Sequence, residues 1–256
     1  MKLTYIYHSG FALEWPEEGV TIIVDFYRDA DGVADKVAES LIRQAKHLYV
    51  LSTHFHPDHF DPTILSWKET RPDIRYIFSK DILKRKRAKQ GEAHFLRKGE
   101  CYVDEFIRVD ACGSTDVGSS FLIRLGEWTV FHAGDLNNWH WSEESTAEEV
   151  RKAEGDYLAE LAYLRTRTTA VDVAMFPVDG RMGHDYMRGA RQFIEHIKTS
   201  VFVPMHFEPH YEAGHAFRPE AEQMGVQFVK LTHQGQTVVV NKEQTVNLLD
   251  TEQLNN

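Results

Sequence analysis

The segment His54-Phe55-His56-Pro57-Asp58-His59 constrains this chain more than any other part of its sequence. It brings three imidazoles and one carboxylate together within six residues. A domain does not need such a cluster of polar side chains in order to pack its core. Imidazole nitrogen and carboxylate oxygen are the ligands that borderline divalent cations take. The segment follows Leu48–Leu51, a short apolar run typical of a buried strand, and Ser52-Thr53. The sequence therefore predicts a fold in which a strand ends at a metal-binding loop.

The spacing within this metal loop (residues 54–59) indicates two ions. In an extended segment His54 and His56 project to the same side, because side chains repeat every second residue. Pro57 turns the chain, so the adjacent Asp58 and His59 point in other directions. One loop could therefore serve two neighbouring ions. The alternative is a chance histidine cluster on a surface loop.

The bulk properties exclude several classes of protein. The 256 residues suffice for one large domain or two small ones, and the net charge of −10 disfavours nucleic acid as a partner. No run approaches the ~20 apolar residues of a membrane span, and the N-terminus lacks a signal-length apolar run. Cys101 and Cys112 make no disulfide framework. We expect a soluble, cytoplasmic protein that acts on a small molecule without membrane contact; its oligomeric state is open.

The order of the predicted elements indicates the fold class. Strands come in meandering runs early in the chain and alternate with helices later, a pattern that predicts an α/β (α+β) four-layer αββα sandwich of two mixed β-sheets flanked by helices. We expect a single domain over residues 1–249 and a polar C-terminal tail over 250–256. The predicted strands are Leu3–Tyr7, Phe11–Trp15, Val20–Val24, Leu48–Leu51, Arg75–Ser79, Phe106–Ala111, Ser119–Arg124, Trp128–His132, Val171–Phe176, Val201–Pro204, Phe228–Leu231 and Thr237–Val240. The predicted helices are Asp35–Ala45, one capped by Asp61 before Pro62, Asp81–Gln90, one opened by a capping box at Ser145–Glu148 and running to Leu164, and Tyr186–Ile197.

Four other apolar runs end at or beside a residue that can bind a metal. These residues are Asp25, Asp135, Asp179 and His206. In layered α/β folds, binding sites are built at the ends of strands. We therefore expect these side chains to complete the site that the metal loop begins.

The order His-x-His-x-Asp-His, then Gly134-Asp135, then a late His206 resembles the metallo-β-lactamase-fold hydrolase superfamily. The segments His132–Asp135, Phe176–Asp179 and Pro204–His206 are similar to the branch that includes L-ascorbate-6-phosphate lactonase-like proteins. The resemblance spans roughly residues 7–236. It is specific for the fold and says little about the substrate, since one fold hosts many chemistries.

The resemblance implies a ligand set for two divalent ions, zinc first, with manganese or iron as alternatives. His54 and His56 would bind the first ion; Asp58, His59 and His206 would bind the second. Asp135 would bridge the two ions, and Asp58 and Asp135 are the candidate catalytic carboxylates. Asp25 would orient a ligand imidazole, or else serve as a turn carboxylate at a strand end.

One departure from the family pattern concerns the first ion. The family supplies a third histidine from the region that corresponds here to Asp110–Ser119, which contains no histidine. His94 lies too early in the chain to replace it. Asp116 is the best substitute, ahead of Ser114, Thr115 and Cys112; the alternative is that Gly113–Gly118 forms only a turn. The first site is therefore expected to be weak, or the protein holds one ion.

Several residues near these motifs have either a functional or a local structural role. His8 lies at a strand turn, His132 is three residues before Asp135, and His184 follows Asp179. Trp139, with Trp141, could cover the pocket and select the substrate. The alternative is that the two side chains pack on the core as a hydrophobic staple before a helix. Arg181 and Arg188 could receive an anion. We expect His210 and His215 to be exposed.

The predicted function is a metal-dependent hydrolase. A bound metal lowers the pKa of water to about 7, so that a metal-bound hydroxide could cleave an ester, lactone or phosphoester of a small acidic metabolite. A nuclease or phosphodiesterase of the same fold is the first alternative, which the acidic balance disfavours. Di-iron redox chemistry is a further alternative. It is disfavoured, because relatives with that chemistry carry a carboxylate at the position that His56 occupies here. A degenerate, non-catalytic metal-binding protein is the remaining alternative.

Overall fold

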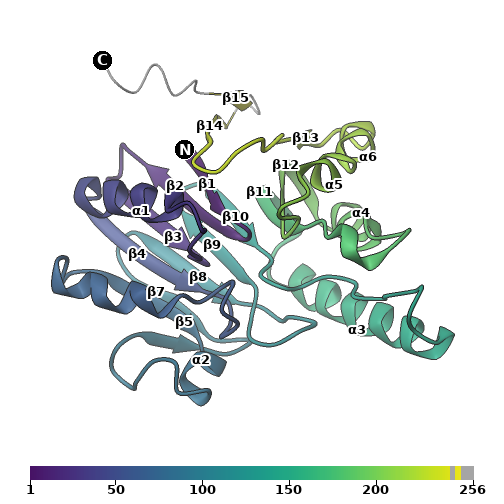
Figure 1. Cartoon of the computed structure of the whole chain (residues 1–256), viewed down its shortest axis with the longest axis horizontal. Helices are drawn as coiled ribbons and strands as arrows, with labels where there is room; N and C mark the ends of the chain where they lie inside the picture. Colours follow the sequence, from purple (N-terminus) through teal and green to yellow (C-terminus); the bar gives the residue numbers. More distant parts are fainter. Residues whose placement is uncertain (243–245, 249–256) are drawn as a thin grey trace. The chain divides into compact units, whose positions relative to one another are not determined.

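The computed structural model describes residues 1–242 and 246–248, which fall into two compact units (Figure 1). The first unit comprises Met1–Leu96 and the described residues that follow Leu231, and the second comprises Arg97–Leu231. Each unit contains one mixed β-sheet and its own helices, which confirms the predicted class of two mixed sheets with helices. The domain limits 1–249 stay a prediction, and the predicted tail 250–256 lies outside the described residues.

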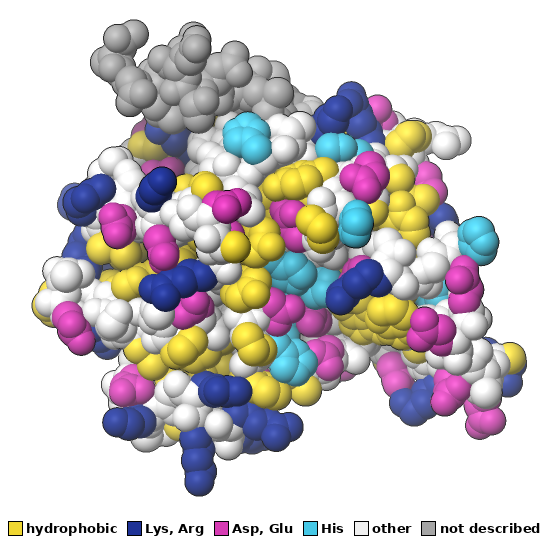
Figure 2. Space-filling view, viewed as in Figure 1, with side chains coloured by type: hydrophobic (Ala, Val, Ile, Leu, Met, Phe, Trp, Pro, Cys, Tyr) yellow, Lys and Arg dark blue, Asp and Glu magenta, His cyan; other side chains and the backbone are white. Residues whose placement is uncertain are grey.

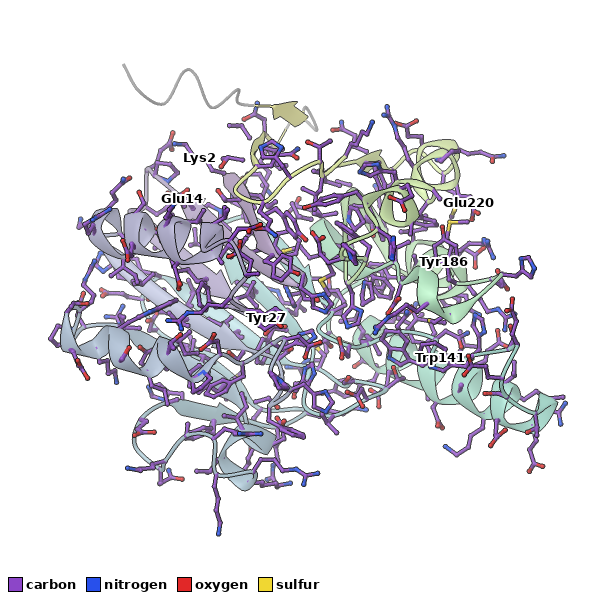
Figure 3. The ribbon with its side chains drawn as sticks, in the orientation of Figure 1. Lys2, Glu14, Tyr27, Trp141, Tyr186 and Glu220 are labelled. Atoms are coloured by element: carbon purple, nitrogen blue, oxygen red, sulfur yellow. The ribbon has the colours of Figure 1, made fainter. Side chains whose placement is uncertain are left out.

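The first unit contains a sheet of eight strands within the described residues, in the order β15-β14-β1-β2-β3-β4-β5-β6. The pairs from β15 to β3 are antiparallel, and the pairs from β3 to β6 are parallel. Its strands are β1 (Lys2–Tyr7), β2 (Gly10–Trp15), β3 (Val20–Val24), β4 (His47–Ser52), β5 (Arg75–Ser79), β6 (His94–Leu96), β14 (Thr237–Val240) and β15 (Val246–Leu248). In this sheet Lys2 of β1 pairs with Glu14 of β2, and both residues are labelled in Figure 3.

The helices of this unit are α1 (Val33–Gln44), the 3₁₀ helix η1 (Pro62–Glu69) and α2 (Lys80–Lys84). They contribute Ala38, Ile64 and Ile82 to one hydrophobic cluster with Ile23 and Val50 of the strands. Asp61 caps η1 by accepting a hydrogen bond from the Thr63 N–H, as predicted. Burial of this apolar face fixes the strands whose ends carry the metal loop.

The second unit contains a sheet of seven strands within the described residues, in the order β13-β12-β11-β10-β9-β8-β7. It too changes from antiparallel pairing, between β7 and β10, to parallel pairing, between β10 and β13. Its strands are β7 (Cys101–Val103), β8 (Ile107–Ala111), β9 (Phe121–Leu125), β10 (Trp128–His132), β11 (Ala170–Pro177), β12 (Lys198–Met205) and β13 (Gln227–Phe228). Its helices are α3 (Ala147–Arg165), η2 (Gly180–Met182), α4 (Arg188–His196), α5 (Tyr211–His215) and α6 (Arg218–Gln223).

Several local predictions need correction. The basic helix predicted over Asp81–Gln90 ends at Lys84, because Lys86 has a φ of 58° and neighbouring like charges weaken a helix. The capping box lies one residue later than predicted: Thr146 and Glu149 exchange the two hydrogen bonds that open α3. Strand β12 begins at Lys198, three residues before the predicted start, and α5 and α6 were not predicted.

None of the helices in the described residues combines the length and the apolar character that crossing a membrane requires.

Candidate metal centre

The predicted site residues of the first unit follow the carboxyl ends of neighbouring parallel strands. Val24, the last residue of β3, pairs with Leu51 of β4, and the Asp25 N–H donates to the Leu51 carbonyl at 3.0 Å. Asp25 and the metal loop after Ser52 therefore begin side by side. The end of a parallel sheet is where such folds place their sites.

Asp25 is a fully buried carboxylate that organises the start of the metal loop. Its Oδ1 accepts from the Thr53 N–H at 2.7 Å, and its Oδ2 accepts from the Thr53 hydroxyl at 2.6 Å. The same Oδ2 lies 2.8 Å from Nδ1 of the buried His59. A carboxylate at Nδ1 holds the ring proton there and directs the Nε2 lone pair toward a ligand position, as it does for metal-bound histidine. Asp25 therefore contacts both the residue before the metal loop and the last residue of that loop, and its orienting role stays a prediction.

His54 and His56 approach each other through their rings. Nε2 of His54 lies 3.0 Å from Nδ1 of His56, and the Thr53 hydroxyl lies 3.1 Å from Nδ1 of His54. The Phe55 N–H between them donates to Asp81 at 2.9 Å, which fixes the loop backbone. Two imidazole nitrogens at this separation suit adjacent positions on one cation.

Asp58 and His59 lie beside His8. Oδ2 of Asp58 is 3.4 Å from Nε2 of His8 and 4.0 Å from Nε2 of His59. One ligand atom from each of these three residues lies within 4.8 Å of the other two. The Asp58 side chain is 37% exposed, whereas His59 is buried, so Asp58 is the member of this group that solvent reaches most readily.

In the second unit His206 lies between two carboxylates. Its Nδ1 is 3.0 Å from Oδ2 of Asp179, and its Nε2 is 3.4 Å from Oδ1 of Asp135. These residues follow β12, β11 and β10, and the register pairs Pro177 with Met205, so the strand ends are adjacent. His206 repeats the arrangement of His59: a buried carboxylate at Nδ1 and Nε2 directed to a candidate ligand position.

Asp179 is held in its charged form. Burial alone would raise the pKa of Asp179, but hydrogen bonds from His206 and Arg181 lower this pKa well below its ordinary range. Arg181 donates from Nε to Oδ1 at 2.9 Å, although its side chain is 64% exposed. The charge of Arg181 is therefore engaged by Asp179. Arg188 pairs with Asp185 at 2.7 Å, and its role as an anion receptor stays a prediction.

The turn that presents Asp135 is held from both sides. Nδ1 of the buried His132 accepts from the Gly134 N–H at 3.1 Å, and Gly134 has a φ of 53°, which favours glycine. Nε1 of Trp139 donates to the Asp135 carbonyl at 2.8 Å. His132 therefore contacts the backbone of the turn that presents Asp135.

The Trp139 side chain contacts two predicted metal ligands of the second unit, His206 and Asp135. Its ring centroid is 5.6 Å from that of His206, and it stacks on Trp141, labelled in Figure 3, at 6.3 Å. The tryptophans thus form an apolar wall next to His206 in addition to their contact with the Asp135 turn.

Asp116, the predicted substitute for the missing histidine, is brought to Asp135. It is exposed, and one of its carboxylate oxygens lies within 4.8 Å of an Asp135 oxygen. Thr115 anchors this segment by donating from its hydroxyl to the Asn137 carbonyl at 2.6 Å. Cys112 is a poor ligand, because burial raises the pKa of its thiol to about 12.

Three further histidines of this unit differ in their exposure. His184 does not join the predicted residues of its unit: its side chain is fully exposed, and its N–H donates to Glu143 at 2.9 Å. The adjacent Gly183 has a φ of 83°, a conformation that favours glycine. His210 is exposed as expected, but His215 is half-buried on α5 and its Nε2 bonds the Leu231 carbonyl.

Backbone strain marks the same positions. Among the described residues, the non-glycine residues with positive φ include His8 at 55°, Asp25 at 49° and His206 at 63°. Such conformations persist only where the surroundings hold them, and they are concentrated at functional sites. Sequence reasoning missed Thr53 as the partner of Asp25; its place directly before the metal loop was the available signal.

The donor set fits divalent transition-metal ions. It consists of imidazole nitrogens and carboxylate oxygens, two of the imidazoles are oriented by carboxylates, and thiolates take no part. These ligands suit zinc, manganese and iron alike.

Comparison with known proteins agrees with this chemistry. No protein-family model matches the chain. It is similar to a UPF0173 metal-dependent hydrolase of Desulforamulus reducens, with 26% identity over 227 residues that cover 81% of this chain and 84% of the relative. It is also similar to the UPF0173 metal-dependent hydrolase NEQ378 of Nanoarchaeum equitans, with 24% identity over 97% of this chain and 100% of the relative.

Solved structures show the fold. The metallo-β-lactamase fold protein YhfI of Bacillus subtilis matches with a TM-score of 0.61 at 13% identity, over 92% of this chain and 97% of that protein. CmlA, a diiron β-hydroxylase of Streptomyces venezuelae, matches with a TM-score of 0.62 at 14% identity, over 97% of this chain and 54% of that protein. The chain has the metallo-β-lactamase fold, as predicted, and its relatives support a metal-dependent hydrolase.

Proposed function

We propose that this protein is a metal-dependent hydrolase that cleaves an ester, lactone or phosphoester of a small acidic metabolite. One observation carries the proposal: His59 and His206 each have Nδ1 held by a buried carboxylate, Asp25 and Asp179 respectively. This is the arrangement that metal-binding histidines use. The proposed ligands are His54, His56, Asp58, His59, Asp135 and His206, with Asp116 as an additional candidate.

Divalent ions would supply Lewis acidity and a nucleophile at neutral pH, because a bound cation lowers the pKa of water to about 7. The chain's own residues provide position and charge. Asp25 and Asp179 fix their histidines, and His132 and Trp139 fix the turn of Asp135. Asp58 is the carboxylate of its group and is partly open to solvent, so it is suited to accept a proton as well as to bind a metal.

An acidic substrate is supported by a basic surface beside the metal loop. The Arg85 guanidinium lies 4.8 Å from the ring centroid of Phe55, the residue between His54 and His56. Around it the exposed side chains of Lys84, Lys86, Arg87 and Lys89 gather near α2 (Figure 2). This cluster contrasts with the overall charge of −10, and a guanidinium can receive a carboxylate or phosphate in a bidentate manner.

The test of the reaction is a panel of carboxylic esters, lactones and phosphoesters, each in an acidic and a neutral form, assayed before and after chelation. We expect cleavage of at least one acidic compound, its loss on metal removal, and recovery when zinc, manganese or iron is returned. Activity that survives complete metal removal would contradict the proposal.

The test of the substrate class is Arg85→Ala, with Arg43→Ala on α1 as a matched exposed control. We expect Arg85→Ala to raise KM about 3- to 10-fold for the acidic compound only, since an exposed charge contact contributes roughly 1 kcal/mol. Equal KM values for acidic and neutral compounds in the wild type and in both variants would contradict an acidic substrate. Cleavage of RNA in preference to every small ester would favour the nuclease alternative.

A further inference from the structure

The turn between β1 and β2 holds His8 in a fixed, unfavourable backbone conformation. His8 has a φ of 55°, a left-handed region that few residues other than glycine adopt, asparagine, aspartate and histidine more often than the rest. Two residues later, Gly10 allows a close approach: a Cβ there would lie 2.8 Å from the Asp25 carbonyl oxygen. The turn is therefore pressed against the backbone of the residue that orients His59.

Aromatic contacts hold the His8 ring. It meets the ring of Tyr27, labelled in Figure 3, edge to face at 6.3 Å, and Tyr27 stacks on Tyr7 at 5.5 Å. It also meets the His59 ring edge to face at 5.8 Å, with 82° between the planes. The His8 side chain is 13% exposed, so its direction is set by packing.

The donor atoms of His8, Asp58 and His59 form a triangle of the size that one cation requires. The Asp58 oxygen is 3.4 Å from Nε2 of His8 and 4.0 Å from Nε2 of His59, and all three ligand atoms lie within 4.8 Å of one another. At zinc–ligand distances of about 2.0–2.1 Å, neighbouring ligands of a tetrahedral site are separated by about 3.4 Å. Small side-chain shifts suffice to bring the three atoms onto one ion.

We propose that His8 is a direct ligand of the divalent cation held by Asp58 and His59. The inference rests on the proposed function and extends it, because the predicted ligand set does not include His8. Two histidines and one carboxylate from the first unit then bind the same ion, a set that suits zinc, iron and manganese. This ion is bound more tightly than the one at His54 and His56, for which the family's third histidine is absent.

The alternative is that His8 only hydrogen-bonds to Asp58 and stabilises the turn. The test therefore measures metal binding as well as the stability of the metal-free protein. His8→Gly removes the imidazole and accepts positive φ without strain, and His8→Asn is a second variant that tolerates the same backbone. His59→Ala serves as the reference for a lost ligand, and His94→Ala, an exposed histidine of the same unit, is the matched control.

The experiment titrates zinc into full-length metal-free protein against a chromophoric chelator and records the visible absorption spectrum of the cobalt-substituted protein. For His8→Gly and His8→Asn we expect the affinity of the tighter ion to fall at least about 10- to 100-fold, and the cobalt bands of this ion to shift. His94→Ala is expected to match the wild type in both measurements.

Wild-type affinity and an unchanged cobalt spectrum in His8→Gly, together with loss of the ion in His59→Ala, would overturn the inference and leave the proposed function standing. A wild-type protein that binds no metal at all would overturn both. Urea unfolding of the metal-free variants separates these results from misfolding, because a direct ligand acts on the metal-bound protein and a purely structural turn residue acts on both forms.

Discussion

His59 in the first unit and His206 in the second present the same local chemistry, built in different ways. Each has Nδ1 next to a buried carboxylate, at 2.8 Å from Asp25 and 3.0 Å from Asp179. Asp25 also accepts two hydrogen bonds from Thr53, a neutral residue directly before the metal loop. Asp179 also accepts hydrogen bonds from Arg181, a cation whose side chain is mostly exposed.

The difference shows that the two carboxylates depend on their surroundings in different ways. Asp25 is enclosed, so removing its charge leaves buried donors of Thr53 and His59 without their acceptor. Asp179 is balanced by a charge that reaches solvent, so part of any change there is compensated by water. We therefore expect the first unit to respond more strongly to substitution than the second.

The largest effect is expected from Asp25→Asn. The asparagine amide would donate to Nδ1 of His59 and leave the ring proton on Nε2, where a metal would bind. We expect zinc affinity to fall about 100-fold and the free energy of unfolding to fall by about 2–4 kcal/mol. Zinc titration and urea unfolding measure the two effects, with the exposed Asp73→Asn as control. Unchanged zinc affinity would remove Asp25 from the site.

A smaller effect is expected from Asp179→Asn, with Arg181→Ala below it. The first variant loses the carboxylate at His206 and should bind zinc about 10-fold more weakly; the second keeps the carboxylate and should bind it less than about 3-fold more weakly. The same zinc titration ranks them. If Arg181→Ala were the more damaging, the guanidinium would be acting on the substrate or the metal directly, and the comparison with Thr53 would be wrong.

The metal loop could be predicted from the sequence because its residues are contiguous and its ligand chemistry is visible in six positions. Asp135 and His206 could be placed only by the resemblance and by their positions after apolar runs. The orienting pair of Asp179 with His206 could not be predicted, because it depends on the register between β11 and β12. The basic helix was extended too far because composition alone does not show where Lys86 takes positive φ.

Asp116→Ala tests whether the Asp116 carboxylate takes the place of the missing third histidine. Asp116 is exposed and lies near Asp135, so we expect loss of up to about one ion with little change in the free energy of unfolding. Metal analysis of the purified variant, beside Glu105→Ala as an exposed control, measures the loss. Full metal content would show that the 113–118 segment serves only as a turn.

Asp110→Asn should have no effect on metal affinity, because the partners of this buried carboxylate are arginines and not a metal-binding histidine. It pairs with Arg108, Arg124 and Arg167 in the second unit. We expect the free energy of unfolding at pH 7 to fall by about 1–3 kcal/mol, with wild-type zinc binding by the folded protein. A change in zinc affinity would mean that any buried carboxylate of this unit affects the ligands, whatever its partner.

The pH dependence of this effect follows from the Asp110 pKa. Burial would raise the pKa of Asp110, but hydrogen bonds from Arg108 and Arg167 lower it below its ordinary value. A depressed pKa contributes stability above the unfolded-state value of about 3.9 and loses it as pH falls toward the folded-state value. The stability difference between wild type and Asp110→Asn, measured by urea unfolding, should therefore shrink below about pH 4. A difference that grew in acid would contradict the assigned direction.

Metal content per folded chain tests whether the carboxylate-oriented histidines of both units, His59 and His206, bind divalent ions. After saturation with zinc and removal of excess, elemental analysis should find two ions in the wild type and fewer in both His59→Ala and His206→Ala. Wild-type metal content in both variants, or no retained metal in a wild-type protein saturated in turn with zinc, manganese and iron, would contradict the account.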